Sequence, residues 1–243
     1  MADRARALPG SAAGSGAAFA EIAPGLTDAA TGDVTLSAWI KWNGNQSCAW
    51  AYSLGSSDQR YLFATPQCGG NLIGAVKLNG EQRATNDGPA STTHWSHVAV
   101  VLTSGVSVST YVDGVQVAST PTSATGAATV GTATFSGLIG KSLYGGDPLF
   151  AGAIDDVRVD RAALSTAQVQ EIAAPVADAI VQRDLDAIDL GDTSAVTGDL
   201  SLPRTGTEGS TITWTSSNTD VIDANGAVRR PAPGSANATV TLT

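Results

Sequence analysis

Residues 150–173 read FAGAIDDVRVDRAALSTAQVQEIA, and they join a strand pattern to a helix pattern. Side chains alternate between the two faces of a strand. If Val157 and Val159 face a core, Asp155 is therefore expected to face it as well. A buried carboxylate needs a metal ion, a cation or several backbone N–H donors. The surroundings of this aspartate are thus the first question that the sequence raises.

The chain before this stretch is dominated by short strand patterns. Residues 34–42, VTLSAWIKW, carry apolar side chains at the even positions from Val34 to Ile40. The pair Asp113-Gly114 predicts a tight hairpin, because a type I′ turn needs positive φ at both central residues. Strands separated by turns about every ten residues predict an all-β antiparallel sandwich.

Composition and the two ends of the chain indicate which partners and which cellular location to expect. The net charge of −9 disfavours nucleic acid as a partner, and no apolar run approaches the ~20 residues of a membrane span. The opening MADRARALPG lacks the apolar segment of a signal peptide. The closing NATVTLT stops inside an alternating pattern, so we expect a piece of a longer, secreted protein.

Cys48 and Cys68 flank a strand–turn–strand pattern. With residues 55–59 as the turn, Leu54 would oppose Arg60 and Cys48 would oppose Pro66, leaving Cys68 close enough to pair. A disulfide closing a loop of this length stabilises by about 3 kcal/mol and indicates an extracellular compartment. The alternative is two free, buried thiols.

A helix is expected directly after the last strand pattern. Ser165 and Gln168 form a capping box, with Leu164 and Val169 as its hydrophobic staple. We expect this helix over residues 166–173, ending at Pro175.

A second, smaller region follows the helix. A helical stretch at 176–188 precedes further strand patterns, and Asn225-Gly226 is another hairpin signal. We therefore divide the chain into domains at 1–174 and 175–243.

The strand patterns also carry a family resemblance over about residues 11–174. In order, VTLSAWIKW, HWSHVAVVLTSGVSVSTYVDGVQV and the ending GAIDDVRVDRAALS resemble the laminin-G-like (concanavalin A-like) jelly-roll modules of bacterial secreted proteins. The resemblance implies an antiparallel jelly-roll β-sandwich with a short C-terminal helix.

The tail resembles a second family. LSLPRTGTEGSTITWTSSN and NGAVRRP are similar to the atypical bacterial immunoglobulin-like domain, here incomplete. This pairing resembles the accessory region of secreted glycoside hydrolases acting on arabinose-containing polysaccharides. It implies a non-catalytic region that binds such a polysaccharide or positions the catalytic domain of the parent protein. The alternatives are a purely structural spacer or buttress and a protein-binding adhesion module.

Catalysis by this region itself is disfavoured by its carboxylates. Glucanases of this fold need two glutamates on one strand, close enough to act as acid and nucleophile. None of the four glutamates, Glu21, Glu81, Glu171 and Glu208, has a partner at that spacing. His94 and His97 would face opposite sides of a strand, which makes a poor zinc site.

Calcium is the cofactor that the resemblance implies, because such modules often carry a structural calcium ion. Asp155 is the expected ligand, and Asp28 or Asp33 would approach from the N-terminal loop. The alternative is that Asp155 accepts backbone N–H groups without a metal. Asp156 is expected to be solvated or paired with Arg158 or Arg161.

Sugar binding requires rings and hydrogen-bonding side chains on one surface. The loop KSLYGGDP offers Lys141, Tyr144 and Asp147, and its glycines would let a ligand approach the backbone. Neighbouring strands and turns add three further candidates, which are Trp42, Tyr52 and Arg60.

Overall fold

The computed structural model describes residues 6–12, 18–26 and 32–243, with the backbone alone for 175–180. The contacts within the chain divide it into two units, Met1–Asp178 and Ala179–Thr243. Within the described residues, no helix is long and apolar enough to span a membrane.

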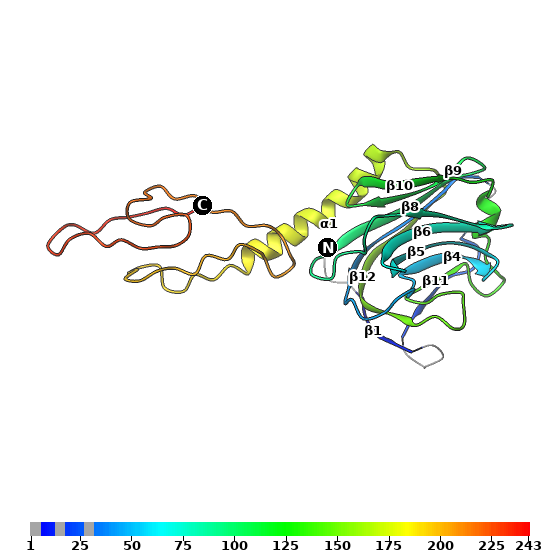
Figure 1. The fold of residues 1–243 in the computed structure, drawn as a ribbon, viewed down its shortest axis with the longest axis horizontal. Helices are drawn as coiled ribbons and strands as arrows, with labels where there is room; N and C mark the ends of the chain where they lie inside the picture. The colour runs from blue at the N-terminus through cyan, green and yellow to red at the C-terminus, as the bar shows by residue number, and fades with distance from the viewer. Residues whose placement is uncertain (1–5, 13–17, 27–31) are drawn as a thin grey trace. The chain divides into compact units, whose positions relative to one another are not determined.

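Unit 1 contains a sandwich of two antiparallel six-stranded sheets (Figure 1). Sheet A has the strand order β1 (Arg6–Ser11), β12 (Leu149–Asp160), β3 (Val34–Trp42), β8 (Ser96–Thr103), β9 (Ser107–Val112), β10 (Val115–Pro121). Sheet B has the order β2 (Ala20–Ile22), β11 (Gly137–Ile139), β4 (Tyr52–Ser57), β5 (Arg60–Cys68), β6 (Asn71–Leu78), β7 (Glu81–Thr85). The architecture confirms the predicted jelly-roll sandwich.

The core lies between the sheets and follows the alternation in the sequence. In β3, every even position from Val34 to Trp42 belongs to the buried core, as the pattern predicts. The hairpin between β9 and β10 is also confirmed, with φ of 49° at Asp113 and 79° at Gly114. A short 3-10 helix, η1 (Gly126–Thr129), adds the fully buried Ala128 to the same core.

The last strand departs from the predicted alternation. Ile154 is buried in the core, and Val157 and Val159 pack against it, three and five residues later. A β-bulge between Asp155 and Arg158 accounts for the change of phase, because an extra residue in one strand reverses the side to which side chains point. The prediction that Asp155 faces the core is therefore wrong.

At the bulge, Asp155 and Asp156 form local hydrogen bonds and an ion pair. Asp156 adopts a φ of 47°, and its backbone N–H donates to Asp155 Oδ1 at 2.8 Å. Its carboxylate pairs with Arg158, with both Nε and Nη2 lying 2.9 Å from Oδ2. The predicted pairing of Asp156 with Arg158 is confirmed.

The strands β4 and β5 are joined by a shorter turn than predicted. The observed register pairs Leu54 with Leu62 rather than with Arg60. The turn is formed by Asp58 and Gln59 alone, and a bulge between Gly55 and Ser57 shifts the pairing by one further residue. Cys48 donates its N–H to Gln67 O at 2.7 Å, which places it beside Cys68. The two cysteines form the predicted disulfide, with a Cα–Cα distance of 4.4 Å.

The helix begins as predicted but ends later. Gln168 Oε1 accepts the Ser165 N–H at 2.9 Å, and Ser165 Oγ accepts the Gln168 N–H at 3.4 Å, while Leu164 packs with Val169. The single helix α1 spans Thr166–Asp186 and passes through Pro175. A proline removes one N–H and bends a helix without always ending it, and the alanines around it favour helix.

Unit 2 contains the end of α1 and irregular backbone. Asp184 is buried and accepts the N–H groups of Glu208 and Ser210 at 2.6 and 2.9 Å. Beyond α1, the described residues form three isolated bridges, such as Ile222 with Val228, rather than the two sheets expected of an Ig-like sandwich. Ile222 is the only buried apolar side chain of residues 187–243, so little apolar burial is available to order long strands.

Candidate functional site

The outer face of sheet B carries a row of polar and aromatic residues on neighbouring strands. The register places Tyr61 of β5 opposite Lys77 of β6, and Lys77 opposite Glu81 of β7. In the adjacent row, Phe63 lies opposite Ala75, and Ala75 opposite Arg83. Residues paired across strands share a face of the sheet, so these side chains all point away from the core.

Three rings form the floor of this face. Trp50 stacks on Phe63, with ring centroids 3.9 Å apart and planes 10° apart. It also meets Tyr61 edge to face, with centroids 4.9 Å apart. The rings of Trp50, Tyr61 and Phe63 are all buried, so the floor itself offers no open ring to a ligand.

Tyr144 lies above this floor, on the loop between β11 and β12. Its ring contacts those of Trp50 and Tyr61 edge to face, at centroid distances of 5.8 and 6.0 Å. The ring is half-buried, whereas the two glycines that follow it, Gly145 and Gly146, are exposed. Tyr144 is thus the member of the aromatic cluster that still reaches solvent.

The loop is braced by its own side chains. Ser142 Oγ donates to Asp147 Oδ2 at 2.6 Å and accepts the Tyr144 N–H at 3.0 Å. These two bonds hold the loop closed at its base and fix the position of the tyrosine ring.

A hydrogen-bond network connects the loop with the strands. The Tyr144 hydroxyl lies 3.0 Å from the Tyr61 hydroxyl and accepts a bond from Lys77 Nζ at 3.1 Å. The Tyr61 hydroxyl donates to Glu81, whose other oxygen accepts from Arg83. Burial, followed by the bonds to Glu81 and Tyr144, raises the pKa of Tyr61 well above its ordinary value. Tyr61 therefore stays protonated and acts as a hydrogen-bond donor.

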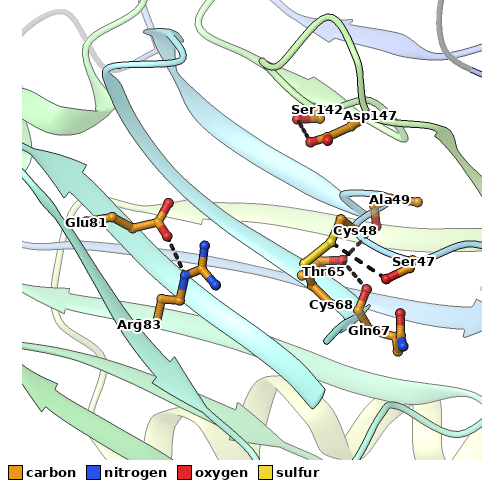
Figure 2. Close-up of a disulfide and its surroundings, with 10 residues drawn as sticks. All are labelled: Ser47, Cys48, Ala49, Thr65, Gln67, Cys68, Glu81, Arg83, Ser142 and Asp147. Atoms are coloured by element: carbon orange, nitrogen blue, oxygen red, sulfur yellow. Dashed lines mark hydrogen bonds and ion pairs between the residues drawn. A yellow bond between two sulfur atoms is a disulfide. The ribbon is translucent and has the colours of Figure 1, made fainter. Parts of the chain in front are cut away.

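The disulfide borders the same face. Cys68 packs against the cluster of Trp50, Tyr61 and Phe63, and Cys48 lies two residues before Trp50. Figure 2 shows the disulfide together with the bonded pairs Ser142–Asp147 and Glu81–Arg83. The cross-link thereby fixes the backbone that presents Trp50.

The structure places the predicted loop residues on different sides of the loop. Tyr144 joins the aromatic cluster, and Asp147 braces the loop from within. Lys141 instead lies over the ring of Phe19, with Nζ 4.2 Å from the centroid. Only Tyr144 thus belongs to the network on sheet B.

The other three predicted sugar-binding residues lie elsewhere. Trp42 and Tyr52 are core residues, 4% and 0% exposed, and the Tyr52 hydroxyl donates to Val98 O at 2.6 Å. Neither ring has a face left for a ligand, which corrects their assignment. Arg60 precedes Tyr61 and so points to the other side of β5, where its guanidinium bonds Ala127 O of η1 at 2.9 Å.

Lys77, Glu81 and Arg83 were missed as candidates, because the sequence carried only part of the signal for them. They lie on β6 and β7, on the two sides of the hairpin turn at Asn79-Gly80. A two-residue turn there would place Lys77 opposite Gln82, whereas the structure pairs Lys77 with Glu81, so the hairpin was predictable but its register was not. The link from this pair to Tyr144, 67 residues beyond Lys77, had no signal in the sequence.

The aspartates predicted to bind calcium do not come together. Asp155 lies opposite Trp39, six residues from Asp33, which is a separation on the order of 20 Å along a strand. Asp33 accepts the Ser104 N–H at 2.8 Å, and Asp28 lies outside the described residues. Within the described part of the chain, no three His, Cys, Asp or Glu side chains are grouped to hold a metal. Calcium therefore stays a prediction, without a shared site for Asp33 and Asp155.

The glutamates of sheet B are widely separated. Glu21 and Arg83 end the row that runs Glu21, Leu138, Ser53, Phe63, Ala75, Arg83 across six strands. Glu81 is on the same edge strand as Arg83, so five strand spacings, on the order of 24 Å, separate it from Glu21. Glycoside hydrolysis needs carboxyl groups roughly 5–10 Å apart, and these two do not meet that condition.

Comparisons with solved structures support the fold. Domain 4 of AbnA, a GH43 extracellular arabinanase from Geobacillus stearothermophilus, solved with arabinotriose, is 18% identical, with a TM-score of 0.54 over 70% of this chain and 87% of that chain. The CBM40 of a Ruminococcus gnavus IT-sialidase, bound to α2,3 sialyllactose, is 13% identical, with a TM-score of 0.51 over 70% and 98%. No curated protein matches the sequence.

Family models match both parts of the chain. Residues 181–243 match the atrophied bacterial Ig domain. Residues 14–170, which include the whole of sheet B and the Tyr144 loop, match the model of the other family. The chain belongs to the concanavalin A-like lectin/glucanases superfamily.

Proposed function

We propose that this chain is a non-catalytic accessory region that binds arabinose-containing polysaccharide at the outer face of sheet B. The binding surface would consist of Tyr144 and the polar side chains bonded around it, Lys77, Glu81 and Arg83. The Ig-like tail and the disulfide agree with a place in a longer, secreted glycoside hydrolase.

The observation that carries the proposal is the position of Tyr144. Its ring is half-buried on an aromatic floor, and its hydroxyl is fixed by Tyr61 and Lys77. A ring held in one orientation costs little conformational entropy when a sugar stacks on it. The charged groups around it can bond the hydroxyls of the same sugar.

The expected affinity is low. Sugar hydroxyls exchange bonds to water for bonds to protein with little net gain, and one half-exposed ring supplies a small apolar contact. A dissociation constant of about 0.1–1 mM corresponds to roughly −5.5 to −4 kcal/mol. Such a module is useful when tethered to an enzyme, because the tether raises the local concentration of substrate.

The main alternative is a spacer without a ligand of its own. A spacer needs no exposed ring, and a face of serine and threonine would suit it. The outer face of sheet B instead presents a tyrosine and three charged side chains in one network. This network favours binding over a purely structural role.

Calorimetric titration of the whole chain with arabinotriose and with arabinan oligosaccharides tests the proposal. Tyr144→Ala should weaken binding at least tenfold while the melting temperature stays near that of the parent chain. Arg60→Ala is the matched control, since Arg60 is exposed and bonds η1 rather than the residues around Tyr144, and it should bind as the parent chain does. Absence of heat with arabinan, arabinogalactan and xylan at millimolar sugar would reject the proposal and favour the spacer.

A further inference from the structure

Lys77 is a cation without a carboxylate partner in the described part of the chain. Its Nζ donates to two neutral acceptors, Asp58 O at 2.9 Å and the Tyr144 hydroxyl at 3.1 Å. A lysine ammonium has three N–H groups, so the third has no protein acceptor among the described residues. In a chain with 22 acidic and 13 basic residues, a half-buried lysine without an ion pair is unexpected.

The surroundings of Lys77 favour a cation but do not neutralise it. Its Nζ lies 5.7 Å from the ring centroid of Tyr61 and 5.6 Å from that of Tyr144. Ring faces attract a cation through their quadrupole and leave its full charge in place. The nearest carboxylate on the facing strand, Glu81, already accepts from Tyr61 and Arg83, one bond on each oxygen.

A second cation lies on the same face. Arg83 uses Nε for Glu81, and its side chain is 53% exposed. Its two terminal nitrogens have no protein acceptor among the residues that the structure describes. Arg83 is the diagonal cross-strand neighbour of Lys77, since Lys77 opposes Glu81 and Ala75 opposes Arg83. Diagonal neighbours are roughly 7–8 Å apart at the backbone, so both side chains can reach one ligand group.

We propose that Lys77 and Arg83 bind the carboxylate of a uronic acid residue, placed beside a sugar that contacts Tyr144. The inference rests on the proposed function, because the same face of sheet B binds the polymer. It adds that the preferred polymer carries acidic sugars as well as arabinose. A guanidinium and an ammonium both form charge-assisted bonds with carboxylates.

The net charge of the whole chain does not favour an acidic ligand. A net charge of −9 repels an acidic polysaccharide at a distance. Binding therefore depends on the local contacts of Lys77 and Arg83, which act within a few ångströms. The effect of salt separates the two ligand types: ions screen the carboxylate contact, whereas contacts with a neutral sugar are insensitive to salt.

The test compares two forms of one polymer, glucuronoarabinoxylan and the same material after chemical reduction of its carboxyl groups. Titrations of the whole chain are made with chelator present, so that no divalent cation bridges protein and polymer. The parent chain should bind the acidic form about tenfold more tightly than the reduced form, the value of one charge-assisted bond. Lys77→Met should remove this preference, and Arg83→Gln should reduce it. Arg60→Gln should leave it unchanged.

The outcomes separate this inference from the proposed function. Equal binding of the two forms by the parent chain overturns the inference and leaves sugar binding in place. Equal weakening of both forms by Lys77→Met also overturns it, because that result indicates that Lys77 only positions Tyr144. If neither form binds, both proposals fail.

Discussion

The outer faces of the two sheets each carry an apolar cluster with a buried tyrosine, but the two clusters are covered in different ways. On sheet A, Tyr111, Ala99 and Val101 are covered by Val169 of α1, so the chain itself completes the packing. On sheet B, the aromatic floor is covered by a loop whose outermost ring, Tyr144, remains half-exposed. The cluster on sheet A is thus covered by a helix, whereas the cluster on sheet B is bordered by polar side chains.

Two tyrosine hydroxyls show what this difference means. The Tyr111 hydroxyl donates to Gln116 at 2.9 Å and lies 3.4 Å from Thr166 Oγ1 at the start of α1, so its bonds fix α1 to the sheet. The Tyr144 hydroxyl bonds Tyr61 and Lys77 at the edge of solvent. The same side chain stabilises the fold on sheet A and orients a surface on sheet B. Substitutions on the two faces should therefore affect different measurements.

The largest effect is expected where α1 covers sheet A. Val169 is fully buried, so Val169→Asp places a carboxylate in an apolar contact without a partner. We expect a loss of about 4 kcal/mol in the free energy of unfolding, measured by urea denaturation. Ala167→Asp, at an exposed position in the same turn, is the control and should change stability by less than about 0.5 kcal/mol. Equal losses in the two variants would show that α1 does not pack on sheet A.

The disulfide beside sheet B should give the next largest effect. Its cysteines are 20 residues apart in the sequence, and replacing both by serine frees that loop in the unfolded state. The expected loss is about 3 kcal/mol, read from the shift of the urea midpoint. Because Cys68 packs on the aromatic cluster, sugar binding should weaken as well. An unchanged midpoint would mean that the cross-link does not constrain the chain.

His97, on the outer face of sheet A, should make the stability of the fold depend on pH. The side chain is 1% exposed, with its ring 5.5 Å from that of Trp39. Burial, assisted by Arg158 and opposed by Asp156, lowers the pKa of His97 from 6.5 to about 4. Below pH 6.5 the unfolded chain therefore binds a proton that the folded chain does not bind until about pH 4.

Stability should accordingly be highest above pH 6.5 and decline as the pH falls toward 4. The contribution of His97 to this decline is at most about 3 kcal/mol. Urea unfolding of the parent chain and of His97→Gln at several pH values isolates it, because the carboxylates are common to both. Parallel profiles for the two proteins would show that His97 is not buried in its neutral form.

The smallest effects are expected from removing the hydroxyl groups of Tyr144 and Tyr111 one at a time. Tyr144→Phe removes the acceptor of Lys77 but keeps the ring, so sugar affinity should fall about fivefold, which corresponds to about 1 kcal/mol. Tyr111→Phe should lower the free energy of unfolding by a similar amount and leave the affinity unchanged. A loss of affinity in Tyr111→Phe alone would place the ligand on sheet A.

Local patterns predicted more of the fold than of the site. The alternation of β3, the Asp113-Gly114 hairpin and the Ser165–Gln168 cap depend on residues close in sequence, and the structure confirms all three. The bulge at Asp156 could not be predicted in this way. One inserted residue reverses the alternation after it, and the strand around it otherwise keeps its pattern.

The candidate site depends on contacts between distant segments. Tyr144 was predicted from its glycine-rich loop, but its partners Tyr61 and Lys77 lie 83 and 67 residues earlier. The assignment of Trp42 was wrong, since Trp42 continues the even-numbered core face of β3 and the alternation pattern therefore indicates a buried ring. Arg60 was misassigned for the same reason, since it alternates with Tyr61.

The central claim is that the outer face of sheet B, and not that of sheet A, binds sugar. Backbone amide NMR spectra recorded during titration with arabinotriose to millimolar concentration test it most directly. The account predicts saturable shifts in β5, β6, β7 and the loop around Tyr144, with β3, β8 and β9 unchanged. Shifts confined to sheet A or to unit 2, or spectra without any shift at millimolar sugar, would contradict it.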